Sequence, residues 1–210
     1  MKIWTFKGGY DNNLTYLFSD GNSNEAGIID AAVPLNSIQP TIIKENLSPQ
    51  KLLITHLHSD HITYLNEYNK SFPNMEVCVL KVSHESIDKR VLSDGEKLKI
   101  GSLNITTLHT PGHTPDSCCF YVEDVLFSGD TVFVGRTGRT ISAMSNTRQL
   151  FQSITKKILS LPSDTRIYPG HDYGQVQNIT LEENIKISPL LRAKDEQDFV
   201  LRMKQYEKSR

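Results

Sequence analysis

The chain has 210 residues, of which 38% are hydrophobic, and its 23 Lys and Arg residues nearly balance 24 Asp and Glu residues, for a formal net charge of -1. This length and composition fit one soluble globular domain. The charge balance offers no broad field to nucleic acid or anionic lipid, and no apolar run approaches the roughly 20 residues of a membrane-spanning helix, so neither partner is expected.

The first part of the chain alternates strands with helices. It begins with a short strand and lacks the long apolar region of a signal peptide, which predicts a cytoplasmic protein. In chain order the expected elements are strands at 3–6, 13–19 and 27–30, a helix at 34–46, a strand at 52–55, a helix at 60–70, a strand at 76–80 and a helix at 83–91.

The second part repeats this order. A run of strands from 97 to 130 is broken at Gly101, at 110–115 and at 123–124, and an amphipathic helix at 146–160 follows. A last strand at 166–168 precedes helices at 180–187 and 195–206. We therefore expect one α/β domain over residues 1–210, with a short helical C-terminal extension at about 178–210.

The three cysteines form no CxxC pair and no disulfide framework. Cys118 and Cys119 are neighbours in a predicted strand, so their side chains point to opposite faces of the sheet. We expect these two and Cys78 to be reduced thiols that act as small hydrophobic residues, at least one of them in the core.

Residues 55–62 read T-H-L-H-S-D-H-I and concentrate His56, His58, Asp60 and His61 within six positions. An apolar run at 52–54 precedes them, so a buried strand ends here and opens into a loop. Imidazole nitrogens and carboxylate oxygens are the ligands that divalent metals prefer. This segment therefore predicts a metal site.

Three further residues of ligand type follow strands. His113 lies in a Thr-Pro-Gly-His-Thr-Pro bend, His171 follows Pro169-Gly170, and Asp130 follows Gly129. With the earlier four they make seven candidate ligands, which is too many for one tetrahedral metal. They suit two metals about 3.5–4 Å apart that share a carboxylate. Of the other histidines, His84 is expected to be solvated and His109 is a candidate to support a ligand.

In this order the seven residues resemble the metallo-β-lactamase superfamily, whose pattern is H-x-H-x-D-H followed by His, Asp and His. The resemblance implies an αββα four-layer sandwich with the metals at one edge of its two sheets. It also implies that His56, His58 and His113 hold one metal, that Asp60, His61 and His171 hold the second, and that Asp130 bridges them.

Two segments narrow the resemblance to glyoxalase II (hydroxyacylglutathione hydrolase) and persulfide dioxygenases. They are residues 129–140 around Asp130 and residues 168–174 around His171. The resemblance implies that Arg139 and Tyr173 contact a glutathione moiety, and a guanidinium suits a substrate carboxylate. The chain departs from these groups at Thr137, where Cys is usual, and at Asp116, where Gly is usual. It also has only 39 residues after His171, fewer than the helical C-terminal domain of glyoxalase II needs.

We expect a binuclear metal-dependent hydrolase acting on a thioester of a small-molecule glutathione or other thiol conjugate, with Asp60 and Asp130 as catalytic residues. Two divalent ions are expected, zinc foremost and iron or manganese as alternatives. The rival is a glutathione persulfide dioxygenase with a single Fe(II) held through His56, His113 and Asp130. A non-catalytic metal-binding module is a third hypothesis. A homo-oligomer stays open.

Overall fold

The structure is a computed structural model and describes residues 1–80 and 89–209. Most of the helix predicted at 83–91, including His84, lies outside the described residues. Its last two residues, Arg90 and Val91, instead belong to the strand β6, Arg90–Leu92, because their backbone pairs with the preceding strand of the sheet. For these two residues the prediction of a helix is wrong.

Among the described residues, six strands form a first sheet in the order β1-β2-β3-β4-β5-β6. Neighbours from β1 to β3 are antiparallel, and neighbours from β3 to β6 are parallel. The bounds of the first five are β1 Lys2–Gly8, β2 Asn13–Ser19, β3 Glu25–Ile29, β4 Ser48–Leu53 and β5 Glu76–Leu80. β2 and β5 coincide with the predicted strands, because each is a short run of mostly apolar residues that the sheet buries.

A second sheet of the described residues has the order β14-β13-β10-β9-β8-β7. β10 and β13 are parallel, and the other neighbours are antiparallel. Its strands are β7 Lys97–Ile100, β8 Leu103–His109, β9 Cys118–Val122, β10 Val125–Gly129, β13 Arg166–Pro169 and β14 Ile179–Thr180. The predicted breaks between 97 and 130 are confirmed. β14 and the small ribbon of β11 (Val132–Phe133) with β12 (Arg136–Thr137) were not predicted, since two residues show no periodicity.

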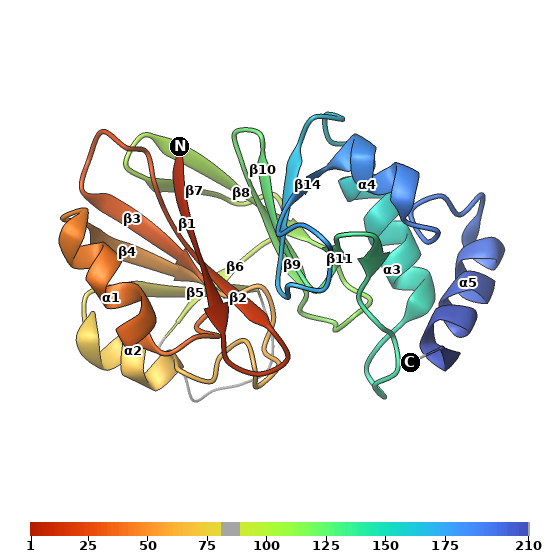
Figure 1. Cartoon of the computed structure of the whole chain (residues 1–210), viewed down its shortest axis with the longest axis horizontal. Helices are drawn as coiled ribbons and strands as arrows, with labels where there is room; N and C mark the ends of the chain where they lie inside the picture. Colours follow the sequence, from red (N-terminus) through yellow and green to blue (C-terminus); the bar gives the residue numbers. More distant parts are fainter. Residues whose placement is uncertain (81–88, 210) are drawn as a thin grey trace.

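Helices cover the outer face of each sheet, as Figure 1 shows, with α1 and α2 beside the first and α3, α4 and α5 beside the second. Their bounds are α1 Leu35–Lys44, α2 Leu65–Ser71, α3 Thr147–Ser153, α4 Leu181–Ile187 and α5 Glu196–Lys208. A π-helical turn, Ile154–Ile158, continues α3 through most of the predicted amphipathic helix. The helices found in the described part of the chain all lack the combination of length and apolar character needed to cross a membrane.

Among the residues that the structure describes, three apolar clusters separate the layers and confirm the four-layer αββα sandwich. One lies between the two sheets, one lies between the first sheet and α1 and α2, and one lies between the second sheet and α3 to α5. Cys118 belongs to the first of these and its neighbour Cys119 to the third, as their alternation in β9 predicts. Both are free thiols and buried, as is Cys78.

The helix predicted at 60–70 is shorter than expected, and its first turn is wrong. α2 begins only at Leu65. The backbone of His61 and Tyr64 instead bonds to Ala31, which follows β3, with N–O distances of 2.9 and 3.0 Å. These hydrogen bonds hold residues 60–64 in turns beside the end of β3. His61 therefore lies before α2 and not within it.

Strand directions bring the ligand-bearing loops to one edge of the sandwich. β3 and β4 are parallel, so Asp30 and His56 follow strands that end together. β10 and β13 are parallel in the other sheet, so Asp130 and His171 also follow strands that end together. An isolated bridge between Asn13 and His171 joins the two sheets at this edge.

Candidate metal centre

Three histidines form a first ligand group, His56, His58 and His113. His56 and His58 follow β4, and His113 lies in the bend after β8. The His56 Nε2 and His58 Nδ1 atoms are 3.0 Å apart, and His58 Nδ1 is 3.1 Å from His113 Nε2. The structure thus brings His113 to His56 and His58, which lie more than fifty positions before it in the sequence.

A second ligand group consists of Asp60, His61 and His171. The Nε2 atoms of His61 and His171 are 3.3 Å apart, and Asp60 Oδ2 lies 3.7 and 3.4 Å from them. Both groups are clusters that could hold a metal ion, since within each of them the ligand atoms all lie within 4.8 Å of one another.

Asp130 lies between the groups. Its Oδ2 is 3.5 Å from His113 Nε2 in the first group and 3.4 Å from His171 Nε2 in the second. Its Oδ1 is 3.3 Å from His61 Nε2. One carboxylate therefore reaches both groups.

The residues fit divalent metal. Ligand atoms held 2.0–2.2 Å from a common tetrahedral ion lie about 3.3–3.6 Å apart, close to the spacings found here. The Oδ1 atom of Asp130 is buried and has no hydrogen-bond partner among the described residues, which an ion would provide. Gly170 packs so close that a Cβ there would overlap this oxygen. Together these features support binding of a divalent metal.

Hydrogen bonds to the far side of three rings orient their Nε2 atoms inward. His61 Nδ1 donates to Asp30 Oδ2 at 2.8 Å, His113 Nδ1 donates to the Arg139 carbonyl at 2.8 Å, and His171 Nδ1 donates to the Asp11 carbonyl at 2.9 Å. Carboxylate and carbonyl oxygens only accept, so each Nδ1 carries the proton and each Nε2 keeps a lone pair for a metal.

Asp30 is a residue of the site that the sequence did not reveal. It is almost fully buried, and it accepts hydrogen bonds from the Thr55 amide at 2.7 Å and the Thr55 hydroxyl at 2.8 Å, besides that from His61. The Thr55 hydroxyl also lies 3.2 Å from His56 Nδ1. Asp30 therefore supports a ligand in each group. The available signal was an acidic residue directly after the apolar strand β3.

Asn13 and Asp11 were missed as well. Asn13 is fully buried at the start of β2, and its Nδ2 donates to Asp60 Oδ2 at 3.1 Å. Asp11 contributes its carbonyl to His171 and accepts a hydrogen bond from the Tyr173 hydroxyl through its own carboxylate. Asp11 lies in a turn-rich segment and Asn13 directly follows it, and the composition there gives no sign of a role at the site.

The protein groups at the centre shift one another's pKa values. Burial alone would raise the pKa of Asp130, but the adjacent His61 and His171 hold it well below its usual value. Burial lowers the pKa of His56, aided by the neighbouring imidazoles. For His61 burial also acts downward, yet Asp130 and Asp30 outweigh it and raise the pKa. The Asp130 carboxylate is therefore ionised, and a metal bound here would displace the proton that the raised pKa favours on His61.

Asp116, which stands where glyoxalase II and the persulfide dioxygenases usually have Gly, has a structural role. Its carboxylate accepts a hydrogen bond from the Leu57 amide at 2.8 Å, between the ligands His56 and His58. Thr137, the other departure, is buried in β12. His109 does not reach the ligands. Its Nε2 lies 2.8 Å from the Pro115 carbonyl and so stiffens the bend that carries His113.

A cavity of about 490 Å³ opens over the ligand groups, within the range of small-molecule sites. Arg139 and Tyr173 line it together with Tyr10 and Ile141. The Tyr173 ring stacks on His171 at 4.8 Å between centroids and 4° between planes. Arg136 contacts Tyr173 instead of the cavity, with its guanidinium 5.4 Å from the ring centroid and 3.0 Å from the carbonyl oxygen.

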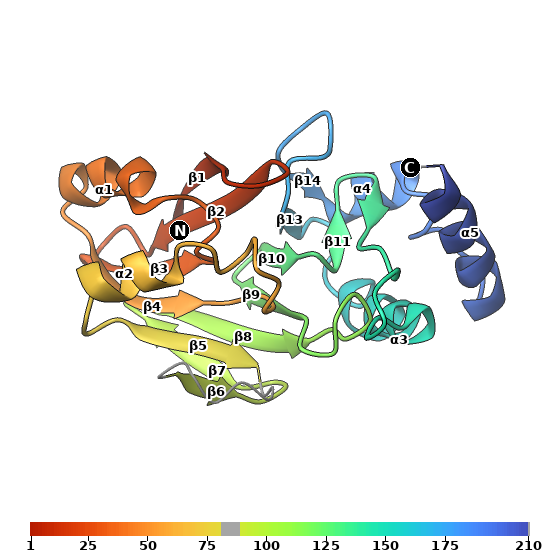
Figure 2. The same ribbon diagram turned by 90° about the horizontal axis from the view of Figure 1, so that it is seen from below.

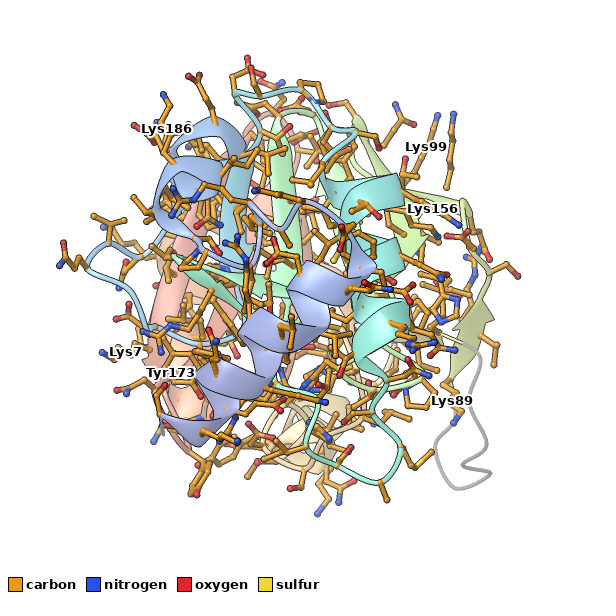
Figure 3. The ribbon with its side chains drawn as sticks, turned by 90° about the vertical axis from the view of Figure 1, so that its right-hand side faces the viewer. Lys7, Lys89, Lys99, Lys156, Tyr173 and Lys186 are labelled. Carbon is orange, nitrogen blue, oxygen red and sulfur yellow. The ribbon has the colours of Figure 1, made fainter. Side chains whose placement is uncertain are left out.

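On the same side of the molecule, Lys7 pairs with Asp172 at 2.9 Å, and Figure 3 shows Lys7 near Tyr173. Asp172 is thus engaged by Lys7 rather than by the ring of His171. The arrangement combines paired ligand groups, a carboxylate within reach of both, and an adjoining cavity lined by the cationic side chain of Arg139.

Comparison with known proteins agrees with this centre. Residues 8–171 match the family described as the metallo-beta-lactamase superfamily. Human mitochondrial persulfide dioxygenase ETHE1 is 32% identical over 181 residues, which cover 85% of this chain and 71% of the human protein. A probable hydroxyacylglutathione hydrolase of Schizosaccharomyces pombe is 35% identical over 173 residues, which cover 79% of this chain and 66% of that protein.

The crystal structure of ETHE1 from Myxococcus xanthus matches with a TM-score of 0.88 at 27% identity and covers 98% of this chain and 91% of that one. The family match includes all seven candidate ligands, from His56 to His171. The chain belongs to the metallo-β-lactamase superfamily.

Proposed function

We propose that this chain is a binuclear metal-dependent hydrolase that cleaves thioesters of the hydroxyacylglutathione type. The observation that carries the proposal is the support given to the second ligand group. His61, His171 and Asp60 each have a hydrogen-bond partner, respectively Asp30, the Asp11 carbonyl and Asn13. Such partners orient ligands for a metal, and their presence in the second group supports metal binding there as well as in the first.

The residues have distinct parts in this proposal. Metals held by these residues would lower the pKa of bound water towards about 7 and would polarise a substrate carbonyl. Asp130, whose carboxylate lies within reach of both ligand groups, would serve as a ligand for a metal in each group. Asp60 is held by Asn13 at 3.1 Å and orients the attacking water by accepting its hydrogen bond. Water adds to the thioester carbon, the C–S bond breaks, and a carboxylate, a thiol and one proton leave.

The volume of the cavity and the charge of Arg139 at its wall suit a small-molecule substrate that carries a carboxylate. Arg139 is exposed at its wall and offers a guanidinium to a substrate carboxylate. The Tyr173 hydroxyl donates a hydrogen bond to the Asp11 carboxylate. This bond fixes the orientation of the Tyr173 ring, which stacks on the His171 ring. The name of the hydroxyacylglutathione hydrolase relative agrees with a glutathione thioester as substrate. We propose that the protein acts in the cytoplasm.

A mononuclear-iron glutathione persulfide dioxygenase is the second candidate. It is favoured by the 32% identity to human persulfide dioxygenase, close to the 35% found for the hydrolase relative. His56, His113 and Asp130 would hold its iron. In the thioester assay this candidate and a non-catalytic metal-binding module both predict an inactive protein, and oxygen consumption separates them.

The test is a pair of assays on metal-loaded protein. Cleavage of a 2-hydroxyacyl thioester of glutathione is followed by loss of thioester absorbance, and oxygen uptake is followed with glutathione persulfide. The proposal predicts thioester cleavage without oxygen uptake. Oxygen uptake without thioester cleavage would refute it.

Arg139→Ala is expected to raise KM for the glutathione thioester with little change in kcat. A charge-assisted hydrogen bond contributes about 1.5–3 kcal/mol, so the rise should be about 10- to 100-fold. Steady-state kinetics measure it, with Arg148→Ala as the control, because the Arg148 side chain is exposed and pairs with Glu196 at 3.4 Å, and Arg148 is absent from the described lining of the cavity. A KM equal to that of the wild type would remove Arg139 from the substrate site.

A further inference from the structure

The peptide group between Arg139 and Thr140 is held at both ends. Its carbonyl accepts the hydrogen bond from His113 Nδ1 at 2.8 Å. Its N–H, on Thr140, donates to Glu207 Oε1 at 2.7 Å, and the Thr140 hydroxyl donates to the same oxygen at 3.1 Å. A carboxylate on the C-terminal helix is thus joined to a metal-ligand candidate through one peptide unit.

The helix that carries Glu207 is fixed to the bend that carries His113. α5 packs beside α3, as Figures 2 and 3 show, with the rings of Phe151 and Phe199 5.4 Å apart. At the start of α3, the backbone N–H of Asn146 donates a hydrogen bond to the Gly112 carbonyl, with an N–O distance of 2.7 Å. Glu207 and His113 therefore belong to one packed unit, although 94 positions separate them (207 minus 113).

This geometry has a consequence for the imidazole. A carboxylate that accepts from an amide N–H polarises the peptide group and strengthens its carbonyl as an acceptor. A stronger acceptor at Nδ1 fixes the tautomer of His113 and makes its Nε2 a better donor to a metal. The same peptide carries the Arg139 side chain at the wall of the cavity.

We propose that Glu207 is a positioning residue for the metal centre, acting on His113 through the Arg139–Thr140 peptide group. Through the same peptide it positions the Arg139 guanidinium, and this second effect rests on the proposed function. The effect on His113 concerns metal binding and involves no substrate.

The test is a cobalt(II) titration of metal-free protein followed by visible absorption. Glu207→Ala is expected to weaken cobalt binding about 10-fold, and Glu207→Gln, which keeps an oxygen acceptor without the charge, about threefold. The matched control is Glu196→Ala in the first turn of the same helix, where the expected change is none. The melting temperature of each metal-free variant shows whether α5 stays packed.

Wild-type cobalt affinity in Glu207→Ala, or an equal loss in Glu196→Ala, would overturn the proposal. If Glu207→Ala does not fold, Glu207→Gln decides, and unchanged affinity there would overturn it. In a His113→Ala background, removing Glu207 should weaken cobalt binding no further, whereas an additive loss would contradict the relay. A wild-type protein that binds cobalt but leaves thioesters intact would refute the proposed hydrolase and leave this test valid.

Discussion

Asp130→Ala is expected to lower kcat for thioester hydrolysis about 10³-fold or more and to prevent the chain from holding two metals together. The Asp130 carboxylate lies 3.3–3.5 Å from three imidazole nitrogens across both ligand groups, so no other described side chain replaces it. Loss of one shared ligand removes several kcal/mol of transition-state stabilisation, and about 4 kcal/mol corresponds to 10³ in rate. Turnover and metal content per chain are measured on the same sample.

The control for this variant is Asp124→Ala. Asp124 directly precedes β10, at the end of the strand away from Asp130, where it is exposed and its backbone carbonyl accepts a hydrogen bond from the Arg166 amide. Its turnover and metal content should equal those of the wild type. If Asp130→Ala kept near-normal turnover with full metal occupancy, the role assigned to Asp130 would be wrong.

Asp30→Ala is expected to lower the free energy of unfolding of metal-free protein by about 3–5 kcal/mol, the range for breaking a buried charged contact. The substitution leaves the Thr55 amide, the Thr55 hydroxyl and His61 Nδ1 without their acceptor in a buried place. Urea denaturation measures the change. Metal-free protein is used so that weaker metal binding adds nothing to the result.

Thr55→Val separates the parts of this network. It removes the hydroxyl that joins Asp30 to His56. It keeps the shape of the side chain and the hydrogen bond from the backbone N–H of residue 55 to the Asp30 carboxylate. The expected loss is about 1 kcal/mol, as for one hydrogen bond. A loss below 1 kcal/mol in Asp30→Ala would show that Asp30 does not anchor this edge of the sheets.

The regular parts of the fold follow from local patterns. β2 and β5 coincide with the predicted strands, and Asn146, Thr180 and Asp195 accept hydrogen bonds from backbone amides at the starts of α3, α4 and α5. Residues 60–64 could not be predicted in this way. Their turns depend on backbone bonds to Ala31, thirty residues away, which no local pattern shows.

The residues of the candidate site likewise fall into those that a local sequence pattern predicts and those that it does not. The seven candidate ligands stand out because His and Asp cluster in loops after apolar strands, and the structure brings all seven together. Asp30, Asn13 and Glu207 do not stand out, because one acidic or amide residue in a strand end or helix resembles any other. Their contacts exist only once the two sheets and α5 have packed.

The number of metals at the centre distinguishes the binuclear hydrolase from its mononuclear rival, and the direct measurement is elemental analysis of the purified, active protein. The binuclear hydrolase predicts two divalent metal ions per chain in a sample that cleaves glutathione thioesters. One iron per chain, in a sample that consumes oxygen with glutathione persulfide and leaves the thioester intact, would contradict it.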